Sequence, residues 1–316
     1  MAAAAAAIRQ RTTCVARSVR RRSRPRRLTT TCWRCVVLSG LSMGFGMGRQ
    51  HMVREEGIQQ MEIFDTHFHL TPEDELGAIA ARALAVGVTR LLVAGAAVGE
   101  AEAVLGQIAA VPAVFAAVGV HPHEAEKFDG DIGYYRGLAG HPRVRAIGEI
   151  GLDYYYDNAP CDTQKAVFRQ FLELARETGL PAVVHCRDAY DDCHALLAEC
   201  LDGGPFVVHC YTGTVEWAQR FLALGGHLSF TGILTFPRSD DVRAAFHSVP
   251  LDRLMFETDS PYLSPVPLRG RVNEPANVAH IVAYAADVLE MPATELAAVT
   301  TTNALKFFGI TADAAV

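Results

Sequence analysis

The sequence contains no long apolar run, no regular cysteine pattern and, after residue 60, little positive charge. The mildly apolar residues 35–47 are too few for a spanning helix, which needs about 20, so we predict no membrane partner. Five of the eight cysteines follow residue 60. An odd number without regular spacing favours free thiols over a disulfide framework. We therefore predict a reducing, cytoplasmic location, and nothing in the sequence implies an obligate protein partner.

Charge is distributed unevenly along the chain. Residues 1–60 contain twelve arginines, no lysine and only Glu55 and Glu56 as acids. The rest of the chain carries 17 basic and 33 acidic side chains, a net charge of −16. Without a basic stripe, binding along a nucleic-acid duplex is disfavoured, whereas an acidic body is compatible with binding cations.

Residues 1–60 differ from the remainder so strongly that we predict an unstructured Arg-rich leader followed by one domain over residues 61–316. Arg-rich, acid-poor sequence is typical of a targeting segment. The alternative is a later translation start, at Met52 or Met61, because Met61 directly precedes the first expected strand.

After residue 60, short apolar runs alternate with helical patterns. Strands are expected at residues 63–64, 90–94, 114–118, 144–148, 182–184, 206–208, 227–230 and 254–256. Helical patterns occur at residues 73–86, 100–110 and 162–178, and near residues 195, 217, 244 and 283. Eight strands alternating with helices over about 250 residues predict an α/β fold, a (β/α)8 TIM barrel. An open doubly wound sheet is the alternative, but it would spread the strand ends along an edge.

Two histidines close the first expected strand. Residues His67 and His69 are separated by one position, and side chains at i and i+2 of a strand point to the same face. Neutral imidazole is the commonest protein metal ligand. The pair therefore predicts half of a metal site, with the remaining ligands at the ends of other strands.

Four further ligand-type residues follow other expected strands: Glu149, His185, His209 and Asp259. The carboxyl ends of barrel strands meet at one mouth, so we expect all six side chains to hold two divalent cations bridged by a carboxylate. Two cations about 3.5–4 Å apart activate a water and stabilise the attacking and leaving oxygens of a displacement. Mixed imidazole and carboxylate ligands do not single out one metal: Mg, Mn and Zn are the expected candidates, and Ni and Fe are compatible with the same ligands.

Other polar residues flank this set. His121 and His123 repeat the spacing, but the proline between them indicates a loop, so we predict substrate contact rather than metal binding. Arg187 shares a face with His185 in an extended segment. It would either bind a phosphate or pair with Asp188 or Asp191.

Carboxylate, thiol and phenol side chains near the expected ligands have less certain roles. Glu257 is expected either to orient a ligand or to be a buried structural carboxylate. Cys186 and Cys210 each follow a candidate histidine and should pack on the opposite face. Residues 154–156 are three consecutive tyrosines, which would either stack a base or pack in a loop.

Six motifs resemble those of the TatD family of metal-dependent deoxyribonucleases, which are TIM barrels. They are FDTHFH (64–69), GVHPH (119–123), GEIGLDY (148–154), HCRDA (185–189), HCYTG (209–213) and ETDSPYL (257–263). They occur in the family's order, and the similarity extends over about residues 61–309. The leader has no counterpart in the family.

The resemblance implies a role for each expected ligand: His67, His69 and Asp259 for one cation, His185 and His209 for the other, and Glu149 as the bridge. Glu149 and Asp259 are then the expected catalytic carboxylates. Arg271 also matches a family position, and we predict that it contacts substrate. The implied reaction is hydrolysis of phosphodiester bonds in DNA, by a 3′-to-5′ exonuclease acting on single-strand ends.

Two other functions compete with this one. Amidohydrolase-type barrels cleave esters or amides, for example in D-aminoacyl-tRNA, but commonly bridge their metals with a modified lysine where this chain has Glu149. A non-catalytic metal-binding scaffold is the second alternative, against which the complete ligand set argues.

Overall fold

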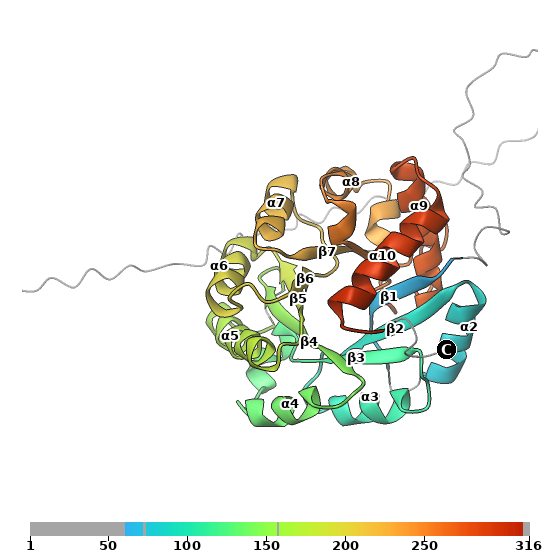
Figure 1. Cartoon of the computed structure of the whole chain (residues 1–316). Coiled ribbons are helices and arrows are strands. Elements are labelled where there is room, and N and C mark those ends of the chain that lie inside the picture. The colour runs from blue at the N-terminus through green and yellow to red at the C-terminus, as the bar shows by residue number, and fades with distance from the viewer. Residues whose placement is uncertain (1–60, 72–73, 157, 312–316) are drawn as a thin grey trace, which may run out of the picture. The chain divides into compact units, whose positions relative to one another are not determined.

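The computed structural model describes residues 61–71, 74–156 and 158–311 (Figure 1). The predicted leader, residues 1–60, lies outside the described part. Eight parallel strands follow one another in sequence order, each hydrogen-bonded to the next. A parallel bridge between Phe68 and Ser260 joins the first strand to the end of the last. The predicted TIM barrel is thereby confirmed.

The strands are β1 Ile63–Phe68, β2 Val88–Ala94, β3 Val114–Val118, β4 Val144–Asp153, β5 Ala182–Arg187, β6 Phe206–Val208, β7 His227–Phe230 and β8 Leu254–Phe256. The described α-helices are α2 Leu76–Ala85, α3 Ala101–Ile108, α4 Ile132–Ala139, α5 Cys161–Thr178, α6 Tyr190–Cys200, α7 Val215–Ala223, α8 Asp240–His247, α9 Val278–Val288 and α10 Ala293–Phe307. Short 3-10 helices are η1 Pro122–Lys127, η2 Gly232–Thr235, η3 Leu251–Arg253 and η4 Pro275–Asn277. Figure 1 shows the helices arranged around the sheet.

Three strands extend further at their carboxyl ends than expected, and β2 begins two residues earlier, at Val88. β1 includes His67, β5 includes His185, and β4 continues four residues beyond Glu149 to Asp153. The reason is that backbone pairing, not apolar character, ends a strand: β4 stays in register with β5 through Asp153 opposite Arg187. Polar residues are tolerated there because they face the mouth of the barrel.

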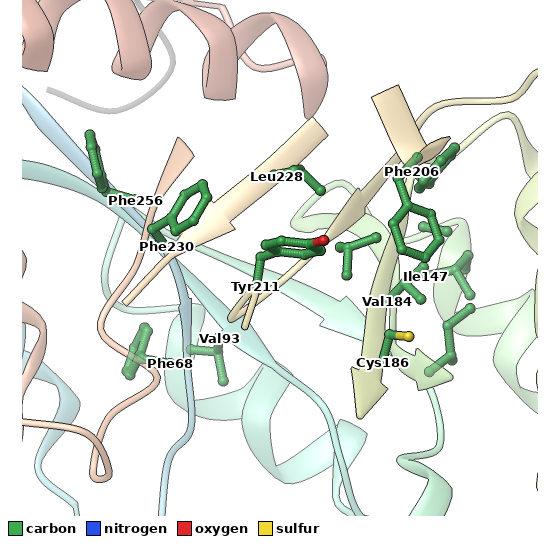
Figure 2. Packing of buried hydrophobic residues seen from close by; sticks show 14 of the residues in the cluster. Phe68, Val93, Ile147, Val184, Cys186, Phe206, Tyr211, Leu228, Phe230 and Phe256 are labelled. Carbon is green, nitrogen blue, oxygen red and sulfur yellow. The ribbon is translucent and has the colours of Figure 1, made fainter. Parts of the chain in front are cut away.

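One face of each strand packs outward against the helices. On β5 these residues are Val184 and Cys186, and on β7 they are Leu228 and Phe230, at the period of two that a strand imposes (Figure 2). All four are buried, which the expected packing role of Cys186 requires. Both faces of a parallel barrel are thus covered.

The inner face forms a separate apolar cluster near the amino ends of the strands. Phe64, Phe115, Val183, Val207 and Met255 each occupy the second position of their strand and lie in this cluster. The end of α10 completes it, with the rings of Phe64 and Phe308 5.7 Å apart. The amino end of the barrel is therefore closed by side chains, most of them apolar.

Within the described residues, no helix is both long enough and apolar enough to cross a membrane. The five cysteines after residue 60 are free thiols.

Candidate metal centre

The first group of ligand-type atoms comes from the ends of β1 and β8 and from Glu149 within β4. The Nε2 atoms of His67 and His69 are 3.3 Å apart. Asp259 Oδ1 lies 3.9 Å from His67 Nε2 and 3.4 Å from His69 Nε2. Glu149 Oε2 lies 3.3 Å and 3.5 Å from the same two nitrogens. Ligands about 2.1 Å from a tetrahedral ion are separated by about 3.4 Å, so these atoms have the spacing of a metal's ligand shell.

The second group uses the other oxygen of the same carboxylate. Glu149 Oε1 is 2.9 Å from His185 Nδ1 and 2.8 Å from His209 Nε2. The two histidine nitrogens are 3.4 Å apart. His121 Nε2 approaches the same oxygen at 3.4 Å. Glu149 therefore presents one oxygen to each group, as a bridging carboxylate must.

The environment of Glu149 fits a cation. The side chain is 2% exposed, and Oε2 is buried without a hydrogen-bond donor among the described residues. Burial favours the neutral acid, but His209 and the other adjacent histidines outweigh it and hold the pKa of Glu149 well below its usual range. A buried anionic oxygen that lacks a donor is costly unless a cation neutralises it.

A glycine allows Glu149 and His185 to face each other. Gly151 in β4 has a φ of +144°, and a Cβ there would lie 2.0 Å from the carbonyl oxygen of His185. No other residue could occupy this position without separating β4 from β5. The close approach of these two strands sets the spacing of the second group.

Two further carboxylates orient the histidines of the second group. Asp153 Oδ2 lies 3.1 Å from His185 Nε2, and Glu257 Oε1 lies 3.2 Å from His209 Nδ1. Each contact occupies the ring nitrogen that faces away from Glu149. This fixes the orientation of the ring and leaves the other nitrogen to bind a metal. Glu257 thus has the geometry of the orienting role considered for it. Asp153 was missed as a site residue, although the period-two argument from Glu149 leads to it.

On the β1 side, a buried carboxylate joins the first and last strands. Asp65 accepts hydrogen bonds from the backbone N–H and the hydroxyl of Thr258, at 2.8 Å and 2.6 Å. The Asp259 N–H donates to the His67 carbonyl at 2.9 Å. Burial raises the pKa of Asp65 well above its usual range. These contacts hold Asp259 beside the paired histidines.

Two of the residues expected to contact substrate, His121 and His123, lie close to the ligand-type atoms. His121 and His123 lie at the mouth, with ring centroids 4.3 Å apart. His121 Nδ1 accepts the His123 N–H, so the neutral His121 ring carries its proton on Nε2, facing Glu149. Burial lowers the pKa of His121 to about 3 and keeps this ring neutral. His123 Nε2 contacts Asp153 Oδ2 at 3.0 Å.

The two candidate arginines differ in position. Arg187 stacks over the rings of Tyr155 and Tyr156. Among the described residues it makes no ion pair with Asp188 or Asp191. The side chain of Arg271 is exposed, and no contact joins it to the ligand-type atoms within the described ranges.

A cavity of about 310 Å³ opens beside the first group. His69 and Ser260 lie at its inner end, and charged residues line its walls, among them Asp74, Arg82 and Glu274. The last two form an ion pair of 2.7 Å. His69 of the first group is part of the lining of this cavity, whereas Asp259 is not.

A closed parallel barrel that gathers four histidines and two carboxylates at the carboxyl ends of its strands is a metal-dependent hydrolase. The sequence model described as TatD related DNase matches residues 64–309. The chain therefore belongs to the TatD family.

Relatives of the chain carry names at two levels of detail. It is 38% identical over 256 residues to the uncharacterized metal-dependent hydrolase YabD of Bacillus subtilis, covering 78% of this chain and 99% of that protein. It is 36% identical over 258 residues to the 3′-5′ ssDNA/RNA exonuclease TatD of Enterobacter lignolyticus, covering 78% and 99%. The structure of YjjV, a TatD homolog from Escherichia coli, superimposes with a TM-score of 0.75 at 28% identity, covering 80% and 100%.

Proposed function

We propose that the protein is a deoxyribonuclease that removes nucleotides from single-stranded DNA in the 3′-to-5′ direction, using two divalent cations. The observation that carries the proposal is the carboxylate of Glu149, whose two oxygens face separate sets of nitrogen and oxygen ligands. His67, His69 and Asp259 would hold one cation, and His185 and His209 the other. Bound there, two divalent cations lower the pKa of a water and stabilise the attacking and leaving oxygens.

The chain's own side chains would prepare this chemistry. Asp153 and Glu257 keep the rings of His185 and His209 turned toward Glu149. Asp259 is 15% exposed, against 2% for Glu149, so it is the carboxylate more accessible to an attacking water. We assign Asp259 as the proton acceptor for the attacking water. The Nε2 proton of His121 is available to donate to a phosphate oxygen.

We propose a strand end as the substrate because of the net charge of the chain and the names of its relatives. The chain after residue 60 has a net charge of −16, so a long duplex would meet no basic stripe, whereas a strand end requires few phosphate contacts. Relatives at 36% identity that are named for 3′-5′ ssDNA/RNA exonuclease activity support the same choice. A cytoplasmic location is part of the proposal and rests on the free cysteines.

The test combines elemental analysis with product analysis. Purified protein should contain divalent metal, and a 5′-labelled single strand should give a ladder of progressively shorter labelled products. A chelator should abolish cleavage, and added Mg²⁺, Mn²⁺ or Zn²⁺ should restore it. Metal-loaded protein that leaves every DNA end intact refutes the nuclease. Release of the amino acid from D-aminoacyl-tRNA in a parallel assay would favour the ester hydrolase, and inactivity in both assays the scaffold.

A further inference from the structure

Two tyrosines beside the metal centre are exposed. Tyr155 and Tyr156 lie two and three residues after the end of β4 and are 58% and 45% exposed. Their ring centroids are 4.8 Å apart and their planes nearly perpendicular. The guanidinium carbon of Arg187 lies 4.1 Å from the centroid of the Tyr155 ring and 4.9 Å from that of Tyr156. We call these three side chains the tyrosine–arginine platform.

The neighbouring tyrosine shows that exposure here is not a property of the whole loop. Tyr154 packs against the barrel core, and its hydroxyl donates to Asp192 at 2.7 Å. Large aromatic side chains are ordinarily buried for most of their area. The next two rings instead point into solvent with an arginine across them, which is the arrangement of an aromatic contact surface for a ligand.

The platform is anchored to the same carboxylate that orients the metal centre. Asp153 Oδ1 accepts the backbone N–H groups of both Tyr155 and Tyr156 at 2.9 Å. Its other oxygen contacts His123 and His185. The buried side chain of Gln164 binds the backbone N–H and C=O of Asp153 at 2.8 Å and 3.0 Å. These hydrogen bonds fix the position of the platform relative to His185.

The path from the platform to the metal centre is short. The ring of Tyr156 meets that of His123 at a centroid distance of 5.4 Å, and His123 meets His185 at 6.3 Å. His185 in turn contacts Glu149 at 2.9 Å. A group resting on the platform therefore lies on the side of the second ligand group.

We propose that the platform is a nucleobase subsite, which stacks one unpaired base of the strand whose phosphodiester is hydrolysed. The proposal rests on the nuclease function proposed above and specifies how that substrate is held. Every base has a π-face that aromatic rings accept, and an arginine plane adds a cation–π contact. Stacking selects a single strand, because a paired base within a duplex cannot lay its face on a protein ring.

The test compares a substrate that has bases with one that has none. The ratio of kcat/KM for a short single-stranded oligodeoxythymidylate to that for methyl p-nitrophenyl phosphate should fall by about 5- to 150-fold in Y155A/Y156A. Arg187→Gln should lower the same ratio. The ratio for Tyr155→Phe, which keeps the ring, should be higher than that for Tyr155→Ala. Arg220→Gln is the matched control, because Arg220 also stacks on an aromatic ring, that of Trp217 at 3.9 Å, but on helix α7; it should leave the ratio unchanged.

Abasic nucleotides identify the stacked position. One base at a time is removed from the oligonucleotide. At the stacked position, removing the base should lower the kcat/KM ratio of the wild type by the same factor as the Y155A/Y156A substitution does. The same removal should not lower the ratio of Y155A/Y156A any further. Independent, multiplying losses at every position would overturn the subsite. Circular dichroism and metal content of each variant separate loss of a contact from loss of the fold.

Failure of the nuclease proposal gives a different result from failure of the subsite. Wild-type protein that hydrolyses neither substrate refutes the nuclease. Fluorescence anisotropy of the labelled oligonucleotide with metal-loaded protein then decides the subsite alone. Weaker binding by Y155A/Y156A supports it, and equal binding of intact and abasic strands by the wild type overturns it.

Discussion

The two ends of the barrel have opposite chemistry although the same strands form both. At the amino end, Val183, Val207 and Met255 pack with the end of α10 in a buried apolar cluster. Two residues further along the same strands stand His185, His209 and Glu257, at the polar mouth. Inward-facing positions recur every two residues. Consecutive inward-facing residues of one strand therefore belong first to the packed core and then to the site.

This difference indicates how stability and function are divided. Apolar burial at the amino end contributes free energy of folding without constraining the chemistry. At the carboxyl end, carboxylates such as Glu149 and Asp65 are almost fully buried, which costs stability unless partners compensate. Substitutions at the two ends should therefore separate activity from stability, and the following predictions test this.

The largest effect is expected at Glu149, whose two oxygens face the two ligand groups. Glu149→Gln keeps the shape but removes the charge shared by both ligand groups, so kcat/KM should fall by at least about 10³-fold, the equivalent of several kcal/mol of lost transition-state stabilisation. The urea midpoint of the metal-free protein should not rise, because a pKa held below its usual range means that the ionised carboxylate stabilises the fold. Glu199→Gln, which alters an exposed carboxylate on α6, is the control. A variant with most of its activity would show that Glu149 is not the bridge.

At the opposite end, Phe308→Ala should reverse this pattern. Phe308 is 2% exposed and lies between Phe64 and Phe307, so truncation should lower the free energy of unfolding by about 3–5 kcal/mol. Turnover per folded molecule and metal content should not change. Leu84→Ala, at a 63% exposed position, serves as the control. A loss of metal from folded Phe308→Ala would mean that the two ends are coupled.

Sequence reasoning located the strands and the ligand-type residues because both depend on short-range geometry. The i, i+2 rule predicts that His67 and His69 share a face, and the structure places their Nε2 atoms 3.3 Å apart. Lengths of β4 and β5 were underestimated, because pairing between strands, not apolar sequence, decides where they end. The stacking of Arg187 on two tyrosines was not specified either, since it depends on how the loop after β4 folds back over β5.

An intermediate effect is expected for the carboxylates that orient the histidines. Asp153→Asn and Glu257→Gln should each weaken metal affinity or activity by about 10- to 100-fold, because the ring of His185 or His209 loses its charged partner. Competition with a chelator of known affinity measures the change. Asp131→Asn, which alters the N-cap of α4, should have no effect on metal affinity. Unchanged affinity in both site variants would restrict these carboxylates to a structural role.

The smallest effect is a dependence of metal affinity on pH. Burial opposes protonation of His69, but its hydrogen bond to Asp259 and the charge of Glu149 outweigh burial and raise the pKa of His69 to about 9, from 6.5. Protonated His69 therefore stabilises the metal-free fold fully below about pH 6.5, and this contribution is lost as pH rises through about 9.

A metal ion needs the unprotonated ring, so binding between these pH values displaces a proton. Affinity should rise by about tenfold per pH unit for each proton displaced. His185 and His209 should steepen the slope, because carboxylate partners outweigh burial and raise their pKa values as well. Calorimetric titration in buffers of different ionisation enthalpy counts the protons released. His69→Gln should release fewer than the wild type, whereas His194→Gln, on α6, should release the same number. Binding without proton release at pH 7 would place the ion away from His69, His185 and His209.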